Sequence, residues 1–376
     1  MLCIVVSSNL EDQVRVGLEI RERVESLLGI KTIFTTECKD FEIDDGAIII
    51  PATGGTERII ESIIESTDKP IMLWALPHHN SLPSALEVYS VYRRRVKLIY
   101  SPISHEVLNE VGKFIGICRL LNSKLRLGII GGISEWILAS NRQDAEDLGI
   151  EIVEIELDEV LSYGPDQIYR ALKEIVTEYG LSALTIKCFD LLKYDTTACL
   201  AVAKLNDEGV VAGCEGDIGA VLTMMIVSGI TGKPCWMANV CRIGKTITLA
   251  HCTVPLTMTE SYELTTHAES GKGTAIIGRL RKDIVTLARY GRRKMLLALG
   301  KVIRNLREDG LCRTQVEVEP FCDIDELIEN SLGNHLVLAY GDIRRDIADL
   351  CKFKGIEVIN LSPYRLHSEA DQFIIG

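Results

Sequence analysis

Residues 1–35 read MLCIVVSSNLEDQVRVGLEIRERVESLLGIKTIFT and decide the fold class of the first part of the chain. The short apolar run Cys3–Val6 predicts a strand, and Glu11–Leu28 has the spacing of apolar residues that is typical of an amphipathic helix. Gly29 predicts a left-handed helix end, and Lys31–Thr35 predicts a second strand. A strand, a helix and a strand in this order indicate a parallel sheet covered by helices.

The same alternation predicts two such domains before residue 241. The first is expected over residues 1–123, and a polar crossing near residues 122–124 leads to the second over residues 124–240. From there the chain changes to alternating apolar and polar runs with few long helices, which predicts a β-rich, barrel-like domain over residues 241–376 that ends in one helix and one strand. The predicted fold class is α/β, with two doubly wound parallel-sheet domains followed by this β-rich domain. The other strands predicted before residue 241 are Ala47–Ile50, Ile71–Leu76, Lys97–Tyr100, Leu125–Ile130, Ile150–Ile155, Leu184–Lys187, Gly209–Ala212 and Pro234–Asn239.

The composition excludes two classes of partner. The 376 residues include 41 Lys and Arg against 53 Asp and Glu, which gives a formal net charge of -12. This acidic balance argues against nucleic acid as a partner, because phosphate backbones are bound by basic surfaces. The most apolar stretch, Ile218–Ile230, is interrupted by polar residues and is shorter than the roughly 20 residues that span a bilayer. We therefore expect no membrane partner.

Cysteine usage and the first residues predict a cytoplasmic protein. The 12 cysteines are spread along the chain without a CxxC pair, whereas a secreted scaffold or a zinc site carries closely spaced cysteines. The first nine residues lack a basic region, and their apolar run is too short for a signal peptide. The scarcity of glutamine fits a heat-adapted organism, in which thermolabile amides are rare.

Two glycine pairs lie between a predicted strand and a predicted helix. Gly54-Gly55-Thr56-Glu57 can place backbone amides and a helix N-terminus around an anionic or hydroxylated ligand, so Gly55 and Thr56 are candidate substrate-binding residues. A tight turn with Thr56 as the helix N-cap is the alternative. Gly131-Gly132 lacks the GxGxxG spacing, and Trp136 would occupy the position of a pyrophosphate, so no nicotinamide cofactor is expected.

The stretch Ala212–Asp217 carries two carboxylates between a predicted strand and a helix, where ligands collect in open α/β sheets. Glu215 and Asp217 are therefore candidates for a metal or acid–base site. The alternative is that Asp217 caps the helix while Glu215 faces solvent. The next predicted strand ends at Asn239, whose amide is expected at the same sheet edge.

Histidine and cysteine add further candidates. His251, His267 and His335 all fall in the predicted β-rich domain. Imidazole together with carboxylate favours Mn²⁺, Zn²⁺ or Fe²⁺, whereas a site made of oxygen ligands alone favours Mg²⁺ or Ca²⁺. Four cysteines near these motifs are interpreted as small buried residues rather than as nucleophiles. They are Cys214, Cys241, Cys252 and Cys312.

These motifs resemble the L-fucose isomerase and L-arabinose isomerase superfamily. The resemblance covers nearly the whole chain and is most specific over residues 210–342. The segments that carry it are Gly213-Cys214-Glu215-Gly216-Asp217, Thr231-Gly232-Lys233-Pro234, Leu249-Ala250-His251-Cys252-Thr253-Val254-Pro255, Thr266–Gly273, Cys312-Arg313-Thr314-Gln315 and Gly333-Asn334-His335.

The resemblance implies an enzyme that interconverts aldoses and ketoses with Mn²⁺, or another divalent cation, through a cis-enediol. It also implies that Glu215 is a metal ligand and acid–base residue, that His335 is a metal ligand, and that His251 matches a further metal-ligand histidine of the arabinose isomerases. The chain departs from the family at Asn239, where fucose isomerases carry a second metal-binding carboxylate. An amide oxygen can coordinate a cation but cannot act as a general base.

The expected site is assembled from these motifs. The expected catalytic residues are Glu215, Asp217 and Asn239, and the expected metal ligands are Glu215, Asn239, His335 and His251. The missing acid–base group is expected from Asp190, Asp217 or Glu269. The expected substrate-binding residues are Asp190, His267, Glu269, Arg313, Gly55 and Thr56.

The leading hypothesis is a cytoplasmic, Mn²⁺-dependent sugar isomerase that forms a homo-oligomer, with a trimer or hexamer implied by the resemblance. In this family the N-terminal domain can complete a neighbouring subunit's pocket, which would bring Gly55 and Thr56 to the sugar. A second hypothesis, motivated by Asn239, is another metal-dependent reaction on a sugar. A third hypothesis is a non-catalytic sugar-binding paralogue.

Overall fold

The computed structural model describes residues 1–361, which form two compact units. The first unit contains residues 1–123, 229–231 and 346–355, and the second contains residues 124–228, 232–345 and 356–361. Residues 362–376, which end the expected third domain, lie outside the described part of the chain.

The first unit is built on a parallel sheet of β1 (Leu2–Val6), β2 (Thr32–Thr35), β3 (Ala47–Pro51), β4 (Ile71–Ala75) and β5 (Val96–Tyr100). The strand order is β2-β1-β3-β4-β5. Cys3 of β1 lies opposite Thr32 on one side and opposite Ile48 on the other, in parallel register. The chain therefore changes its winding direction between β1 and β3, which defines a doubly wound sheet.

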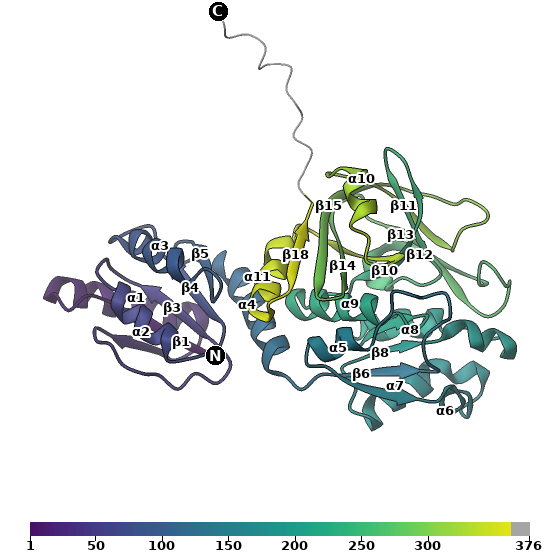
Figure 1. Cartoon of the computed structure of the whole chain (residues 1–376), viewed down its shortest axis with the longest axis horizontal. Coiled ribbons are helices and arrows are strands. Elements are labelled where there is room, and N and C mark those ends of the chain that lie inside the picture. The colour runs from purple at the N-terminus through teal and green to yellow at the C-terminus, as the bar shows by residue number, and fades with distance from the viewer. Residues whose placement is uncertain (362–376) are drawn as a thin grey trace, which may run out of the picture. The chain divides into compact units, whose positions relative to one another are not determined.

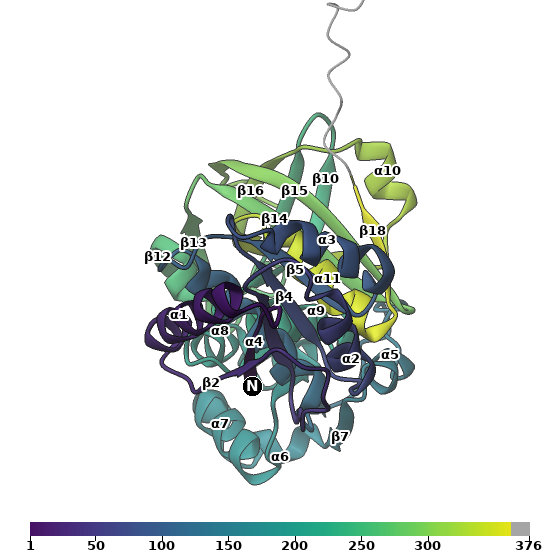
Figure 2. The ribbon, with the colours of Figure 1, turned by 90° about the vertical axis from the view of Figure 1, so that its left-hand side faces the viewer.

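Helices cover both faces of this sheet. Val5 belongs to a core shared with α1 and α4, whereas its neighbour Ile4 belongs to a core shared with α2 and α3. Both faces of β1 are apolar because a parallel sheet is buried on both sides. Figure 2 shows α1, α2 and α3 around β4 and β5. The helices are α1 (Glu11–Leu28), α2 (Glu57–Glu65), α3 (Ser81–Tyr92), α4 (Val107–Asn122) and, from Asp346 on, α11 (Arg344–Lys354).

A buried lysine joins α11 to the sheet of the first unit. The Lys97 side chain in β5 is 0% exposed, and its ammonium lies 2.6 Å from Asp346 and 3.4 Å from Asp349, both in α11. Glu110 of α4 lies 3.3 Å from the same nitrogen. Burial alone would lower the pKa of Lys97, but the three carboxylates outweigh it and raise this pKa. The lysine is therefore charged and held by its acidic neighbours.

The second unit contains a smaller parallel sheet, in the order β7-β6-β8-β9. Its strands are β6 (Arg126–Ile130), β7 (Glu151–Ile155), β8 (Ala183–Ile186) and β9 (Val211–Cys214). The carboxyl end of β9 leads directly to Glu215, so this residue lies at the edge where ligands bind in such sheets. The helices that accompany the sheet are α5 (Gln143–Asp147), α6 (Leu157–Leu161), α7 (Ile168–Glu178), α8 (Cys199–Asp207) and α9 (Ile218–Thr231), with short 3-10 turns at Pro165–Gln167 and Cys188–Tyr194.

The second unit also contains a closed antiparallel barrel. Its strands are β10 (Trp236–Ile243), β11 (Ile247–His251), β14 (Ile284–Gly291), β15 (Lys294–Asn305), β16 (Thr314–Pro320) and β17 (His335–Tyr340). Their order is β14-β17-β10-β11-β16-β15, and pairing of β14 with β15 closes the ring (Figure 1). Trp236, Leu249 and Val316 belong to the apolar core of this barrel. The remaining elements are the hairpin of β12 (Thr259–Thr265) and β13 (Ala275–Leu280), a 3-10 turn at Leu256–Met258, α10 (Ile324–Glu329) and β18 (Glu357–Asn360), which pairs in parallel with β15.

The predicted fold class is confirmed, but two local predictions were wrong and the long helix α4 was missed. The strand predicted at Gly209–Ala212 starts two residues later, because the amide of Val210 still bonds the carbonyl of Leu205 at the end of α8. The helix expected directly after Gly131-Gly132 begins only at α5, since an irregular loop comes first. The helix α4 was not predicted, because Gly112 and Gly116 interrupt its apolar pattern.

No described helix combines the length and the apolar character needed to cross a membrane. We retain the three-part division of the chain as a proposal, with the parallel sheet and the barrel of the second unit as its second and third parts.

Candidate functional site

The carboxyl edge of the second parallel sheet and one end of the barrel bring four of the predicted residues together. Glu215 directly follows β9, and His251 is the last residue of β11. Asn239 of β10 lies opposite His335, the first residue of β17, in the strand register. Because β10 also pairs with β11, three neighbouring barrel strands deliver side chains to this place.

The backbone at Glu215 is held in an uncommon conformation. Its φ is +64°, in the left-handed region that non-glycine residues rarely adopt, and Gly216 follows with φ +69°. A Cβ at Gly216 would lie 2.5 Å from the carbonyl oxygen of Gly132 and 2.5 Å from the Cα of Ile133, so only glycine fits. The amide of Ser134 donates to the Glu215 carbonyl at 3.0 Å. Such conformations concentrate at functional sites, where the surrounding structure maintains them.

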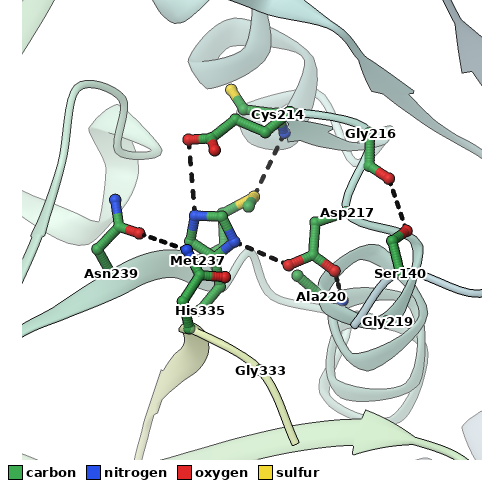
Figure 3. Close-up of polar contacts among 12 residues, drawn as sticks. Ser140, Cys214, Gly216, Asp217, Gly219, Ala220, Met237, Asn239, Gly333 and His335 are labelled. Carbon is green, nitrogen blue, oxygen red and sulfur yellow. Dashed lines mark hydrogen bonds and ion pairs between the residues drawn. The ribbon is translucent and has the colours of Figure 1, made fainter. Parts of the chain in front are cut away.

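Asp217 caps α9, as the sequence suggested. Its carboxylate accepts a hydrogen bond from the amide of Ala220 at 3.0 Å and lies 2.8 Å from Nδ1 of His335 (Figure 3). The Ser140 hydroxyl donates to the Gly216 carbonyl at 2.8 Å. The alternative in which Glu215 faces solvent is wrong, because this residue is only 7% exposed.

Glu215, His251 and His335 form a buried group that could hold a metal ion. One candidate ligand atom from each residue lies within 4.8 Å of the other two. Oε1 of Glu215 lies 3.7 Å from Nε2 of His251 and 3.7 Å from Nε2 of His335. Both ring nitrogens of His251 and Nε2 of His335 are buried without a hydrogen-bond partner. Buried polar atoms without partners are rare in proteins, and here the Nε2 atoms of both histidines lie next to the same carboxylate oxygen.

The neighbouring ionisable groups set the charge of Glu215 and His335. Burial would raise the pKa of Glu215, but His251 and His335 outweigh it and hold this pKa well below its usual range. Burial would lower the pKa of His335, but Asp217 and Glu215 outweigh it and raise this pKa to about 9. An ionised carboxylate therefore faces an imidazolium, whose Nε2 proton a divalent cation would displace on binding.

The group opens into a cavity of about 370 Å³. One wall is aromatic: the rings of Trp136 and Phe189 meet edge to face at 5.0 Å between centroids, and those of Phe189 and His267 meet in the same way at 5.3 Å. The indole N–H of Trp136 donates to Oε2 of Glu215 at 2.7 Å. The two oxygens of Glu215 are thus divided, one facing the histidines and the other bound to the aromatic wall.

Asn239 lines the same cavity, but its side chain is engaged by a neighbour. Its Oδ1 accepts a hydrogen bond from Nδ2 of Asn334 at 2.9 Å. Both residues present neutral amides next to the charged group. The position that a family carboxylate would occupy therefore carries no acid–base group.

The other predicted site residues divide into two sets. His267 and Glu269 line the cavity. Asp190 does not, and its carboxylate pairs with Lys193 at 2.9 Å. Arg313 does not line the cavity either, since its Nε donates to the carbonyl of Thr266 at 2.7 Å.

Gly55 and Thr56 belong to the first unit and are not among the residues around this cavity. Thr56 takes the N-cap position of α2, but its hydroxyl donates to the Thr53 carbonyl and contacts Ser84 rather than bonding an amide of the helix. The surroundings of Thr56 within this unit therefore fit the tight-turn interpretation.

The cysteines are closer to the cavity than the sequence indicated. Cys214 and Cys252 are buried as expected, Cys312 is half-buried, and all three line the cavity, whereas Cys241 is exposed. The neighbouring Cys312 and His267 side chains hold the pKa of the Cys252 thiol well below its usual range. Cys252 directly follows β11 and His267 lies in the loop between β12 and β13, so their proximity depends on the fold and is not visible in the sequence.

The sequence did not identify Phe189 or Arg289 as site residues, and it assigned Trp136 no role. Trp136 and Phe189 stand on loops that follow β6 and β8, the same sheet edge as Glu215. Their position after the carboxyl ends of two parallel strands was the signal in the sequence that could have identified Trp136 and Phe189 as site residues. For Arg289, the signal was a charged residue inside the apolar strand β14.

No model of a known protein family matches the chain. A sulfoquinovose isomerase of Clostridium sp. (strain MSTE9) is 25% identical over 210 residues, which cover 51% of this chain and 46% of the relative. A sulfoquinovose isomerase of Alkalicoccus urumqiensis is 23% identical over 219 residues, covering 52% of this chain and 48% of the relative. The chain therefore spans about half the length of the curated relatives it matches.

Proposed function

We propose that the chain is a metal-dependent sugar isomerase that interconverts an aldose and a ketose. The observation that carries this proposal is the buried group of Glu215, His251 and His335 at the base of a cavity with an aromatic wall. The names of the two relatives support sugar isomerisation as the type of reaction. The cavity of about 370 Å³ falls within the size range of small-molecule sites.

Mn²⁺ is the proposed metal, and another divalent first-row ion would use the same ligands. Two imidazoles and one carboxylate suit these ions, and the unpartnered ring nitrogens of His251 and His335 fit such a ligand set. When bound, the ion would polarise the sugar carbonyl and the neighbouring hydroxyl. Asn239 and Asn334 then serve as neutral hydrogen-bonding groups for sugar hydroxyls.

Two carboxylates are proposed to move protons between the adjacent sugar carbons. Glu215 is one of them, with Trp136 fixing the direction of its Oε2. We assign the second role to Glu269, because it lines the same cavity. Asp190 is paired with lysines away from the cavity, and Asp217 is bound to His335 and to α9.

The lining favours an uncharged sugar. Among the described residues that line the cavity, the charged side chains are the carboxylates Glu215 and Glu269, and none is Lys or Arg. A sulfonate would meet these carboxylates without a Lys or Arg side chain among the described lining residues to pair with it. We therefore propose a neutral aldose as the substrate, a homo-oligomer as the active form, and the reducing cytoplasm as the compartment, in which all twelve cysteines stay free.

Asn239 favours a second candidate, in which the same metal site carries out a different reaction on a sugar. An amide cannot replace the carboxylate that isomerases of the resembling family use at this position. Asn239→Asp separates the two: a divergent isomerase gains aldose–ketose activity, whereas a site rebuilt for other chemistry loses its own.

Metal binding is the first test. We expect elemental analysis and titration of the metal-stripped protein to give one Mn²⁺ per chain. His251→Ala and His335→Ala should each weaken binding by at least tenfold, because each removes one of three ligands. The exposed His105, in the first unit, provides the matched control, and His105→Ala should bind like wild type. Wild-type affinity in both site variants would contradict the proposed centre.

Turnover is the second test. We expect the Mn²⁺-loaded protein to convert at least one neutral pentose or 6-deoxyhexose between aldose and ketose, as followed by NMR, and to leave sulfoquinovose unchanged. Conversion of sulfoquinovose alone would contradict the neutral substrate. Tight sugar binding with no conversion of any sugar would contradict the isomerase and favour a binding protein.

A further inference from the structure

An arginine lies fully buried inside the barrel strand β14. Arg289 is 0% exposed, and its neighbours in the strand are apolar or uncharged. Its guanidinium forms a two-pronged pair with Asp217, with Nη1 2.9 Å from Oδ2 and Nη2 2.8 Å from Oδ1. A buried charge is tolerated only with such a partner, and two parallel bonds fix the direction of the carboxylate as well as its charge.

The carboxylate of Asp217 has no free acceptor position left. Oδ1 accepts from Arg289 and from the amide of Ala220, and Oδ2 accepts from Arg289 and from Nδ1 of His335 at 2.8 Å. Four donors satisfy the four lone-pair sites of a carboxylate. Asp217 thus connects the arginine to the histidine and does not reach the cavity.

This connection determines which ring nitrogen of His335 faces the metal position. Since Nδ1 is bound to Asp217, Nε2 points to Glu215 Oε1 at 3.7 Å and has no hydrogen-bond partner. A ring turned by half a rotation would present carbon atoms there instead. Carboxylates behind ligating histidines perform this orienting task in many metal sites.

Two glycines make room for the guanidinium. A Cβ at Gly333 would lie 2.6 Å from Nη2 of Arg289, and a Cβ at Gly219 would lie 2.9 Å from the same atom. Gly219 stands in the first turn of α9, and Gly333 stands two residues before His335 (Figure 3). The segments that carry Asp217 and His335 therefore both pack closely against the guanidinium of Arg289.

We propose that Arg289 is a positioning residue of the metal centre, which acts through Asp217 to keep Nε2 of His335 aimed at the metal. This inference rests on the metal site of the proposed function. It assigns a task to a residue that is not in contact with the cavity or with a candidate ligand. It also explains why Asp217, although next to the site, is occupied on all sides.

The first experiment measures Mn²⁺ affinity directly, from free Mn²⁺ in electron paramagnetic resonance titrations. We expect Arg289→Gln and Asp217→Asn each to weaken binding by about 10- to 100-fold, and the double variant to be no weaker than the worse single variant. Arg289→Lys, which keeps the charge but not the two-pronged geometry, should lie between wild type and Arg289→Gln. Val302→Ala, a barrel-core change away from the site, controls for lost stability and should keep wild-type affinity.

The second experiment does not depend on the metal. In the metal-stripped protein, nitrogen-15 NMR of the imidazoles should show the Nδ1–H of His335 in a strong hydrogen bond, and this signal should change in Arg289→Gln and return in part in Arg289→Lys. Unchanged imidazole signals and a Mn²⁺ affinity within twofold of wild type in either folded arginine variant would overturn the inference. If wild type binds no Mn²⁺, the proposed function fails, and the imidazole signals still decide the positioning role.

Discussion

Glu215→Gln is expected to lower turnover by on the order of 10³-fold while leaving the fold intact. The amide keeps the size of the side chain but cannot accept a proton. Its nitrogen must also replace either Oε2, which accepts the Trp136 indole N–H at 2.7 Å, or Oε1, which faces the ring nitrogens of His251 and His335. In the first orientation, the amide N–H groups would face the indole N–H of Trp136, so that two donors meet. In the second orientation, an N–H donor would occupy the position of the metal-ligand oxygen.

The measurement is steady-state turnover of the Mn²⁺-loaded variant, with circular dichroism to verify the fold. Glu154→Gln is the matched control, because Glu154 lies exposed on β7 of the same unit and pairs with Arg142 at the surface. The control should turn over like wild type. Wild-type turnover in Glu215→Gln would contradict the assignment of Glu215 as metal ligand and acid–base residue.

Lys97→Met is expected to lower the free energy of unfolding by about 2–3 kcal/mol, because it removes the fully buried cation of this cluster and leaves Asp346 with Lys113 and Asp349 with Lys352 as their remaining partners. Asp346 is almost completely buried, and Asp349 is mostly buried. Methionine fills the space of the lysine stem but offers no charge. Unfolding in urea, followed by circular dichroism and by tryptophan fluorescence, measures the loss.

Two comparisons isolate the electrostatic part of this effect. Lys31→Met changes an exposed lysine of the same unit and should leave the unfolding curve unchanged within error. Lys97→Met combined with Asp346→Asn should recover part of the lost stability, since it removes the excess buried negative charge that the single substitution leaves behind. A double variant no more stable than Lys97→Met would contradict a penalty from unpaired charge.

The fold could be predicted because its signals are local. Most strands of the parallel sheets are short apolar runs, and most long helices repeat apolar residues on one face, so the alternation is visible along the chain. Glu215 could be placed at a sheet edge for the same reason, since a strand end and a helix start flank it. The helix α4 was not predicted, because two glycines interrupt its apolar pattern.

The contacts of the site could not be predicted from local signals. The pairing of Arg289 with Asp217, and the strand register that sets Asn239 opposite His335, depend on how the barrel closes. Asp190 and Glu269 look alike as sequence candidates, yet only Glu269 lines the cavity. The pairing of Asp190 with Lys193 is local, but the place of Glu269 at the cavity depends on how segments that are distant in sequence pack together.

The first unit combines segments that are synthesised at different times, which affects how the nascent chain folds. Its sheet is complete once residue 100 has been synthesised, but Asp346 and Asp349, the counter-charges of Lys97, are translated after the whole barrel. At about 5–20 residues synthesised per second, this delay is on the order of ten seconds or more. During that interval a nascent chain presents a hydrated lysine and an uncovered sheet edge region to any chaperone at the ribosome. A fragment that stops at residue 123 would keep Lys97 without these two partners, whereas a fusion that joins residues 346–355 to the end of this fragment would supply them at once.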